Sequence, residues 1–171
     1  MKALAKGDRA PDFTLKSPDG TIANLKSINQ TGPIVIVFLP DINHSDTTEI
    51  LDNFRDDYNE FTALKASLIP VVHADDNSVG RLHEEHNLNF PVFADPDGEL
   101  FRLYGAREGF LIKRPRKYAY VVDREQTVSK AFRSVDSNKF SRQALYALRD
   151  QMGRSALHNV GQKESSSQKK L

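Results

Sequence analysis

The sequence of 171 residues contains no cysteine and no tryptophan. Without cysteine the chain has no disulfide, no thiolate metal ligand, no thiolate nucleophile and no thiol redox couple. A cysteine-free chain is compatible with any redox environment, so this absence does not indicate a compartment. It does exclude every enzyme class whose chemistry runs through the sulfur of a cysteine.

The sequence also lacks an excess of charge and any long apolar run. Lys and Arg number 24 and Asp and Glu 23, which gives a formal net charge of +1. This balance gives no reason to expect nucleic acid or an anionic membrane as a partner. The longest apolar run, Ile34–Leu39, is far too short to span a bilayer, and no signal-peptide pattern follows the first lysines. We therefore expect a cytoplasmic protein.

The composition is that of an ordinary soluble globular protein. Hydrophobic residues make up 39% of the chain and charged residues 27%, and the length suffices for one sizeable core. From residue 153 the sequence turns polar, with a serine run and two lysines near its end. We expect one folded domain over residues 4–152 and a disordered polar tail over residues 153–171.

Apolar periodicity predicts strands that alternate with helices. The run Ile34–Leu39 is apolar on both faces, which is typical of a central strand covered by helices on both sides. Ile50, Phe54 and Phe61 form one stripe of a helix over Asp46–Leu64. The other predicted elements are a hairpin at Phe13–Leu15 and Thr21–Leu25, strands at Leu68–His73, Phe90–Ala94, Tyr118–Val122 and Thr127–Phe132, helices at 75–87 and 99–104, and a last helix from about Phe140 to Met152. An α/β fold with a mixed sheet follows.

Five segments of the chain, in order and at the right spacing, resemble the peroxiredoxins of the AhpC/TSA type. They are Gly7–Leu15 with the Asp19-Gly20 turn, Ile34–Pro40, Phe54–Phe61, Leu88–Glu99 with Tyr104-Gly105, and Lys117–Asp123. The likeness covers roughly residues 5–150. It implies a thioredoxin-like fold, with a mixed central sheet flanked by helices and an N-terminal β-hairpin extension.

The resemblance also implies a mechanism. In the family, a cysteine in a Pro-x-x-x-Thr-x-x-Cys motif begins the long helix, and the helix dipole and an arginine lower its pKa. The thiolate attacks the O–O bond of a peroxide and becomes a sulfenic acid. In this chain Pro40 matches the motif proline, His44 stands at the threonine position and Thr47 at the cysteine position. A second alignment, which needs a deletion, places Asp46 at the cysteine position.

The chain departs from the family at the reactive sulfur, because it has no cysteine. Neither a threonine hydroxyl nor a carboxylate offers a sulfur that a peroxide can oxidise. Lys117 falls at the usual position of the pocket arginine, and Arg116, one residue earlier, is our candidate for that role. With Arg114, these residues either face the helix start as an anion-binding wall or lie in a solvated loop.

Three functional hypotheses remain from the sequence. The first is a peroxiredoxin-like protein that has lost thiol peroxidase chemistry and acts as a non-catalytic binding or assembly module. The second is an antioxidant peroxidase that works by a cysteine-independent route. The third is a thiol-free hydrolase that uses Thr47 or Ser45 with His44, although neighbours in a loop rarely reach the geometry of a triad.

No motif points to a cofactor or a metal. The chain has no phosphate loop and no dinucleotide fingerprint, and the His83 and His86 pair lacks the spacing of a zinc-binding helix. We expect no cofactor, no metal, no nucleic acid and no membrane partner. A homodimer, built on surfaces that such domains commonly use, is the one partner we expect.

Overall fold

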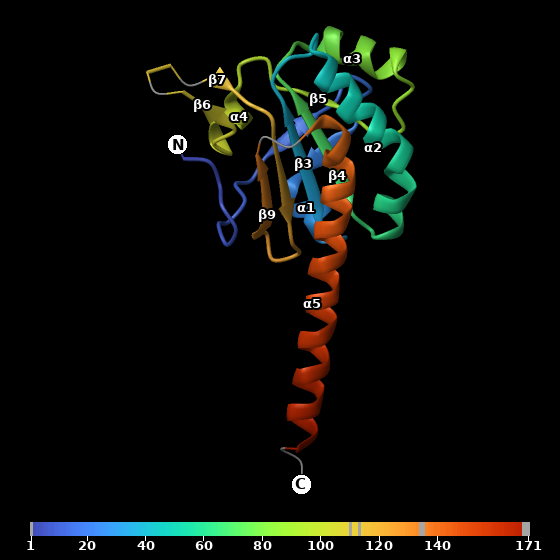
Figure 1. Cartoon of the computed structure of the whole chain (residues 1–171), viewed down its shortest axis with the longest axis vertical. Helices are drawn as coiled ribbons and strands as arrows, with labels where there is room; N and C mark the ends of the chain where they lie inside the picture. The colour runs from blue at the N-terminus through green and yellow to red at the C-terminus, as the bar shows by residue number, and fades with distance from the viewer. Residues whose placement is uncertain (1, 110, 113, 134–135, 169–171) are drawn as a thin grey trace.

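A computed structural model describes residues 2–109, 111–112, 114–133 and 136–168. Strands and helices alternate as the sequence predicts (Figure 1). In chain order they are β1 (Thr14–Lys16), β2 (Ile22–Asn24), α1 (Leu25–Asn29), β3 (Ile34–Leu39), α2 (Ser45–Ala63), β4 (Ser67–Val72), α3 (Asp76–Glu85), β5 (Phe93–Ala94), α4 (Glu99–Leu103), β6 (Arg107–Glu108), β7 (Arg114–Pro115), β8 (Tyr118–Val122), β9 (Val128–Arg133), the 3₁₀ turn η1 (Ser137–Lys139) and α5 (Phe140–Gln168).

The central sheet has five strands in the order β5-β4-β3-β8-β9. Strand β3 pairs in parallel with β4 and antiparallel with β8, so the sheet is mixed as predicted. All six residues of β3 are fully buried. This burial explains why its sequence is apolar at every position rather than at alternate ones.

Alternate residues of β3 enter two cores, one on each face of the sheet. Val35, Val37 and Leu39 pack with side chains of α2, α3 and α5. Ile36 and Phe38 pack on the other face with side chains of α4 and the N-terminal segment. Figure 1 shows α2 and α5 on the same side of the sheet. The result is the three-layer thioredoxin-like arrangement that the sequence predicts.

The predicted N-terminal hairpin is confirmed. Strands β1 and β2 pair antiparallel, with Leu15 opposite Ala23. Gly20 in the connecting turn has φ +91°, a conformation that glycine adopts without strain. The short helix α1 is an addition to the prediction. The Asn24 side chain caps it by accepting a hydrogen bond from the Ser27 backbone N–H at 3.1 Å.

The basic segment before β8 contains a small hairpin rather than a plain loop. Glu108 of β6 pairs with Arg114 of β7, and Arg107 pairs with Pro115. Each strand has only two residues, so neither carries the alternation by which a strand is recognised in a sequence.

The last helix differs from the sequence-based expectation. Helix α5 continues through Gly153 to Gln168, where we expected a disordered tail from residue 153. Good helix formers such as Arg154, Ala156 and Leu157 follow Gly153, and Arg154 pairs with Asp150 at 3.0 Å along the helix. Residues 169–171 of the expected tail lie outside the described residues.

Among the described residues, no helix combines the length and the apolar character needed to cross a membrane.

Candidate functional site

The antiparallel pairing of β3 with β8 brings together the segments of the predicted site. Pro40 directly follows β3, and a short turn leads from it to the start of α2. Phe38, near the end of β3, lies opposite Tyr118, the first residue of β8. The residue before β8, Lys117, therefore comes to the start of α2 although 70 positions separate it from Thr47. The sheet register thus builds the site.

His44 caps the N-terminus of α2. Its Nδ1 accepts a hydrogen bond from the backbone N–H of Asp46 at 3.1 Å. The side chain stands 59% exposed beside the helix. Because Nδ1 acts as an acceptor, its lone pair is engaged with the backbone and the ring satisfies one of the free N–H groups of the first turn.

Thr47 lies in the first turn of α2 and is buried, with 2% of its surface exposed. Its Oγ1 donates a hydrogen bond of 2.5 Å to the backbone carbonyl of Asp41. Its backbone N–H donates to the carbonyl of His44 at 3.0 Å. The hydroxyl therefore fastens the Pro40–His44 turn to the helix.

Asp46, the alternative to Thr47 in the sequence alignment, faces outward and joins an ion pair. Its Oδ2 lies 3.2 Å from Nζ of Lys117, and its side chain is 43% exposed. Lys117 Nζ also donates to Ser137 Oγ at 3.4 Å and lies 5.4 Å from the centre of the Phe140 ring. The hydrogen bond from Lys117 is the main cause that lowers the pKa of the Asp46 carboxyl, helped by the charge of Lys117.

The basic cluster before β8 is divided between two places. Lys117 faces the start of α2, whereas Arg116 is 58% exposed and its Nε lies 4.0 Å from Glu108 Oε2. Glu108 also accepts a hydrogen bond of 2.6 Å from the Tyr118 hydroxyl. Burial and this hydrogen bond raise the pKa of Tyr118 to about 12. The cation at the helix start is thus Lys117, and Arg116 belongs to a separate polar contact.

The charges and donors at the start of α2 satisfy one another. The Asp46 carboxylate stands where a helix N-terminus favours an anion, and Lys117 neutralises it. No hydrogen bond among the described residues joins His44 to the hydroxyl of Thr47 or Ser45. A hydroxyl without a base is a weak nucleophile. The arrangement stabilises the helix start and offers no activated group.

The other histidines make structural contacts. His83 Nε2 lies 3.0 Å from the carbonyl oxygen of Phe90, and His86 Nδ1 lies 2.8 Å from Asp52 Oδ1. Arg55 joins the second contact, because its guanidinium lies 3.1 Å from Asp52 and donates to the His86 carbonyl. This cluster ties α2 to the end of α3. Sequence reasoning missed it because Asp52 and His86 are far apart in the chain.

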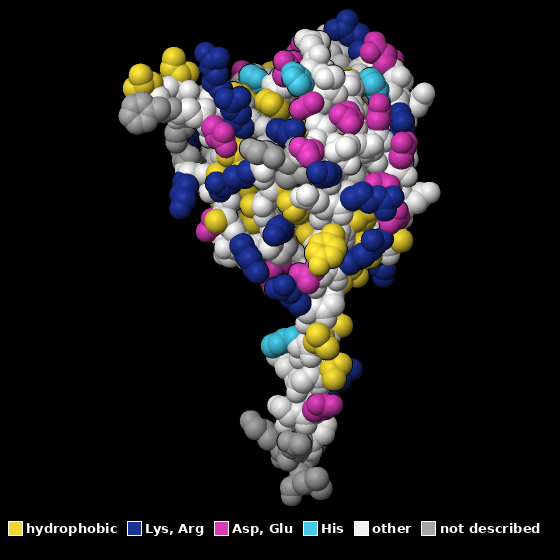
Figure 2. All heavy atoms as spheres, viewed as in Figure 1, with side chains coloured by type: hydrophobic (Ala, Val, Ile, Leu, Met, Phe, Trp, Pro, Cys, Tyr) yellow, Lys and Arg dark blue, Asp and Glu magenta, His cyan; other side chains and the backbone are white. Residues whose placement is uncertain are grey.

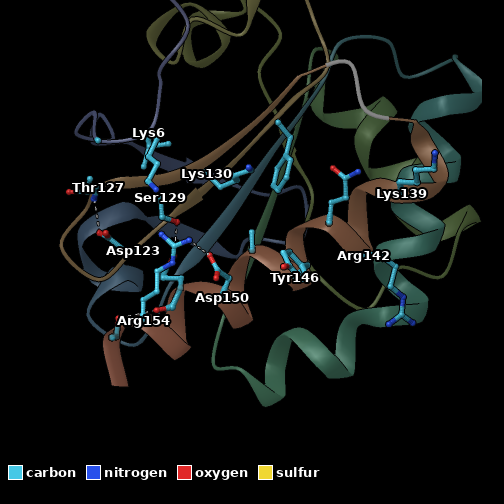
Figure 3. Close-up of a pocket in the computed structure, with 17 residues that line it drawn as sticks. Lys6, Asp123, Thr127, Ser129, Lys130, Lys139, Arg142, Tyr146, Asp150 and Arg154 are labelled. Carbon is cyan, nitrogen blue, oxygen red and sulfur yellow. Dashed lines mark hydrogen bonds and ion pairs between the residues drawn. The ribbon is translucent and has the colours of Figure 1, made fainter. Parts of the chain in front are cut away.

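A groove of about 880 Å³ lies elsewhere, between α5 and β9. Figure 3 shows Ser129 and Lys130 on the strand side, and Tyr146, Asp150 and Arg154 on the helix side. None of Pro40, His44, Asp46, Thr47, Arg116 and Lys117 lines it. The volume falls within the range of ligand and peptide clefts, so the molecule has a concave surface remote from the predicted site.

Comparisons with known proteins place these features in a family context. Residues 6–131 match the sequence profile of the AhpC/TSA family. Peroxiredoxin Bcp of Bacillus subtilis is 27% identical over 149 residues, which cover 84% of this chain and 94% of that protein. The crystal structure of peroxidoxin BcpB from Mycobacterium tuberculosis superposes with a TM-score of 0.79 at 25% identity, and covers 86% of this chain and 97% of its own. A structure of PrxQ from Xylella fastidiosa shares the fold, with a TM-score of 0.80 at 16% identity and coverage of 89% and 99%.

Proposed function

Because this chain belongs to the AhpC/TSA family and carries no cysteine, we propose that it is a non-catalytic member, which acts by binding or assembly. One observation carries the proposal. The residue at the family's nucleophile position, Thr47, is buried and its hydroxyl is bonded to the Asp41 carbonyl.

The family's reaction needs sulfur at this position. A thiolate displaces one oxygen from the peroxide O–O bond and retains the other as a sulfenic acid, which a second thiol then reduces. A threonine oxygen cannot take up a further oxygen atom in this way. A second cysteine that could resolve a sulfenic acid is also absent from the chain.

Lys117, the cation at the start of α2, is already engaged by other residues of the chain. Lys117 is held at 3.2 Å by Asp46 and at 3.4 Å by Ser137. In a reactive site such a cation lowers the pKa of a thiol, whereas here it lowers the pKa of a carboxyl that belongs to the chain. These contacts support a structural role for the start of α2, which corresponds to the catalytic site of the family.

The two enzymatic alternatives receive no comparable support. A hydrolase based on Thr47 or Ser45 needs His44 as its base, and His44 Nδ1 instead accepts the Asp46 backbone N–H. A cysteine-independent peroxidase needs another redox group, and among the described residues no group of three or more His, Asp or Glu side chains is placed to hold a metal ion. The location that we propose is the cytoplasm, which rests on the balanced charge and the short apolar runs of the sequence.

The test is the consumption of hydrogen peroxide by the purified chain, with thioredoxin or glutathione and their reductases as electron donors. We expect no consumption above the protein-free rate, while an active peroxiredoxin in the same mixture serves as the positive control. The purified chain is treated with a thiol-blocking reagent, which is removed before the donors are added, and catalytic consumption by the treated chain would overturn the proposal. The same chain assayed against ester substrates, beside His44→Ala, tests the hydrolase, and we expect equal background rates for both.

A further inference from the structure

The second half of α5 extends away from the body of the molecule (Figure 1). Side chains from Met152 to Ser167 are all exposed. Their side-chain bonds stay within the helix, as between Gln162 and His158 at 2.9 Å. A single helix of this length is only marginally stable in water, and Gly153 and Gly161 weaken it further. Packing against a partner is what stabilises most helices of this kind.

Exposed apolar side chains concentrate on this helix. Four of the seven large hydrophobic side chains that are exposed in the described chain lie on α5: Tyr146, Met152, Leu157 and Val160. Tyr146 is 75% exposed and Leu157 is 76% exposed. Figure 2 shows apolar side chains on the projecting helix and on the body above it, facing the same side. Tyr146, Leu157 and Val160 lie on one face of α5 by their spacing, and exposed apolar groups on one face mark an interaction surface.

The apolar face of the projection continues into the groove between α5 and β9. The helix side of that groove carries Lys139, Gln143, Tyr146 and Asp150. These positions follow one another at intervals of four, three and four residues, and Leu157, Val160 and Glu164 prolong the same spacing. Intervals of three and four place side chains on one face of a helix, as in paired helices.

We propose that two copies of this chain form a dimer in which the projecting half of each α5 lies antiparallel in the groove between α5 and β9 of the other copy. The two-fold axis passes close to Gln151 and Met152, where the helix leaves the body. The lengths agree. Residues 153–168 span about 24 Å, and the part of α5 beside the body, residues 140–152, spans about 20 Å.

In this arrangement, side chains of matching character face one another. Leu157 packs on Tyr146 of the second copy, and Val160 lies over the aliphatic part of Gln143. Glu164 meets Lys139, a pair of opposite charge, while Arg154 keeps its partner Asp150 within the same helix. A two-fold axis repeats each contact, which gives a self-complementary interface. The chain's own projection therefore fits the groove in length, polarity and charge.

The dimer deepens the proposed function by naming the surface for assembly. Its test is separate from the peroxide assay, so either proposal can fail without the other. Lining residues of the groove, among them Lys139, Gln143 and Tyr146, take no part in the contacts at the start of α2.

The first measurement is the mass of the full chain by sedimentation velocity over a range of concentrations. We expect a species of twice 19.3 kDa. Leu157→Lys should raise the dimer dissociation constant at least about a hundredfold, because each dimer loses two buried leucine contacts. Asn159→Lys makes the same change of charge on the opposite side of the projection and should leave the dimer intact. A monomer at every concentration, or a dimer indifferent to Leu157→Lys, overturns the proposal.

A charge exchange tests the register. Lys139→Glu should weaken the dimer, and combining it with Glu164→Lys in the same chain should restore it, because the pair is then rebuilt with reversed signs. Lys139 also pairs with Asp136 at 2.7 Å within one copy, and the second substitution cannot repair that local contact. Failure of the double variant to recover the wild-type dissociation constant rules out this register.

The absence of native cysteine makes the orientation directly measurable. Gln143→Cys and Val160→Cys chains, mixed and oxidised, should form a disulfide-linked pair. Either variant alone should not form one, because equivalent positions of antiparallel helices then lie about 25 Å apart, whereas a disulfide spans under about 7 Å between Cα atoms. A linked product from a single variant would mean parallel helices and would refute the proposal.

Discussion

Replacing Thr47, which we propose stands at the family's cysteine position, by cysteine introduces a sulfur and asks whether its surroundings activate it. The position is 2% exposed, and the group there donates a hydrogen bond to the Asp41 carbonyl. Burial and an acceptor carbonyl both favour the protonated thiol. The helix N-terminus favours the thiolate, but the nearby cation Lys117 is already paired with Asp46. We therefore expect the pKa of the new thiol to stay at or above its ordinary value of about 8.5.

An ordinary thiol and an activated thiol differ clearly in the fraction that is ionised at neutral pH. A thiol with a pKa of about 8.5 is roughly 3% ionised at pH 7, whereas an activated thiol with a pKa of about 6 is roughly 90% ionised. The thiolate populations thus differ about thirtyfold. Because the chain has no other cysteine, the rate of alkylation against pH reports this single thiol. A midpoint below pH 8, with a fast reaction toward hydrogen peroxide, would mean that the surroundings do activate the thiol, contrary to our expectation.

A second substitution isolates the role of the carboxylate. Adding Asp46→Asn to Thr47→Cys removes a negative charge beside the thiol and releases Lys117 from its partner. Both changes favour the thiolate, so the midpoint should fall by about one pH unit relative to the single variant. Asp56→Asn, which removes a carboxylate farther along the same helix, is the matched control and should leave the midpoint unchanged.

Three further results follow from the contacts of the folded chain. Lys117→Met should lower the free energy of unfolding by about 1 kcal/mol, measured by urea denaturation, because the partly exposed Asp46 carboxylate loses its ion pair. Because the fold lowers the pKa of Asp46, the ion pair stabilises the folded state at pH values above the unfolded pKa of about 3.9. The difference in unfolding free energy between wild type and Lys117→Met should therefore close as the pH falls below about 4. A difference that persists to pH 2 would contradict this expectation. Gly105→Ala should cost about 2 kcal/mol in the same assay, because φ is +66° and the added Cβ would lie 2.3 Å from the Lys2 carbonyl oxygen.

The elements with strong periodicity could be predicted from the sequence almost to the residue. The apolar run Ile34–Leu39 is β3 and Tyr118–Val122 is β8, because full burial on both faces leaves an uninterrupted apolar signature. The stripe of Phe54 and Phe61 likewise placed α2 within one residue at each end. Because burial requires apolar residues at these positions, these elements can be predicted without the structure.

The short elements and the end of α5 could not be predicted from the sequence. A two-residue strand such as β6 is fixed by its partner across the sheet and has no pattern of its own. The stretch of residues 154–168 after Gly153 has the polarity of a disordered segment, and its two large apolar residues, Leu157 and Val160, are too few to indicate a packed helix. Its helical state depends on continuity with the packed half of α5 and, in our proposal, on a second copy.

The sequence proposes residues for the candidate site but does not predict their contacts. The motif placed Thr47 at the helix start, and the structure buries it there. The choice between Arg116 and Lys117 depends on which side chain turns toward α2, and both lie between β7 and β8, where no strand pattern fixes the direction of a side chain. The pairing of Lys117 with Asp46 across the fold has no trace in the local sequence.

The proposed loss of peroxidase chemistry can be tested directly in a single-turnover experiment with the wild-type chain. The purified protein is mixed with an equimolar amount of hydrogen peroxide in the absence of any reductant, and the remaining peroxide is followed beside a protein-free sample. We expect the two traces to coincide, because Thr47 offers no oxidisable sulfur and its hydroxyl is bonded to Asp41. Loss of one equivalent of peroxide, at the rate of an active peroxiredoxin, would contradict it.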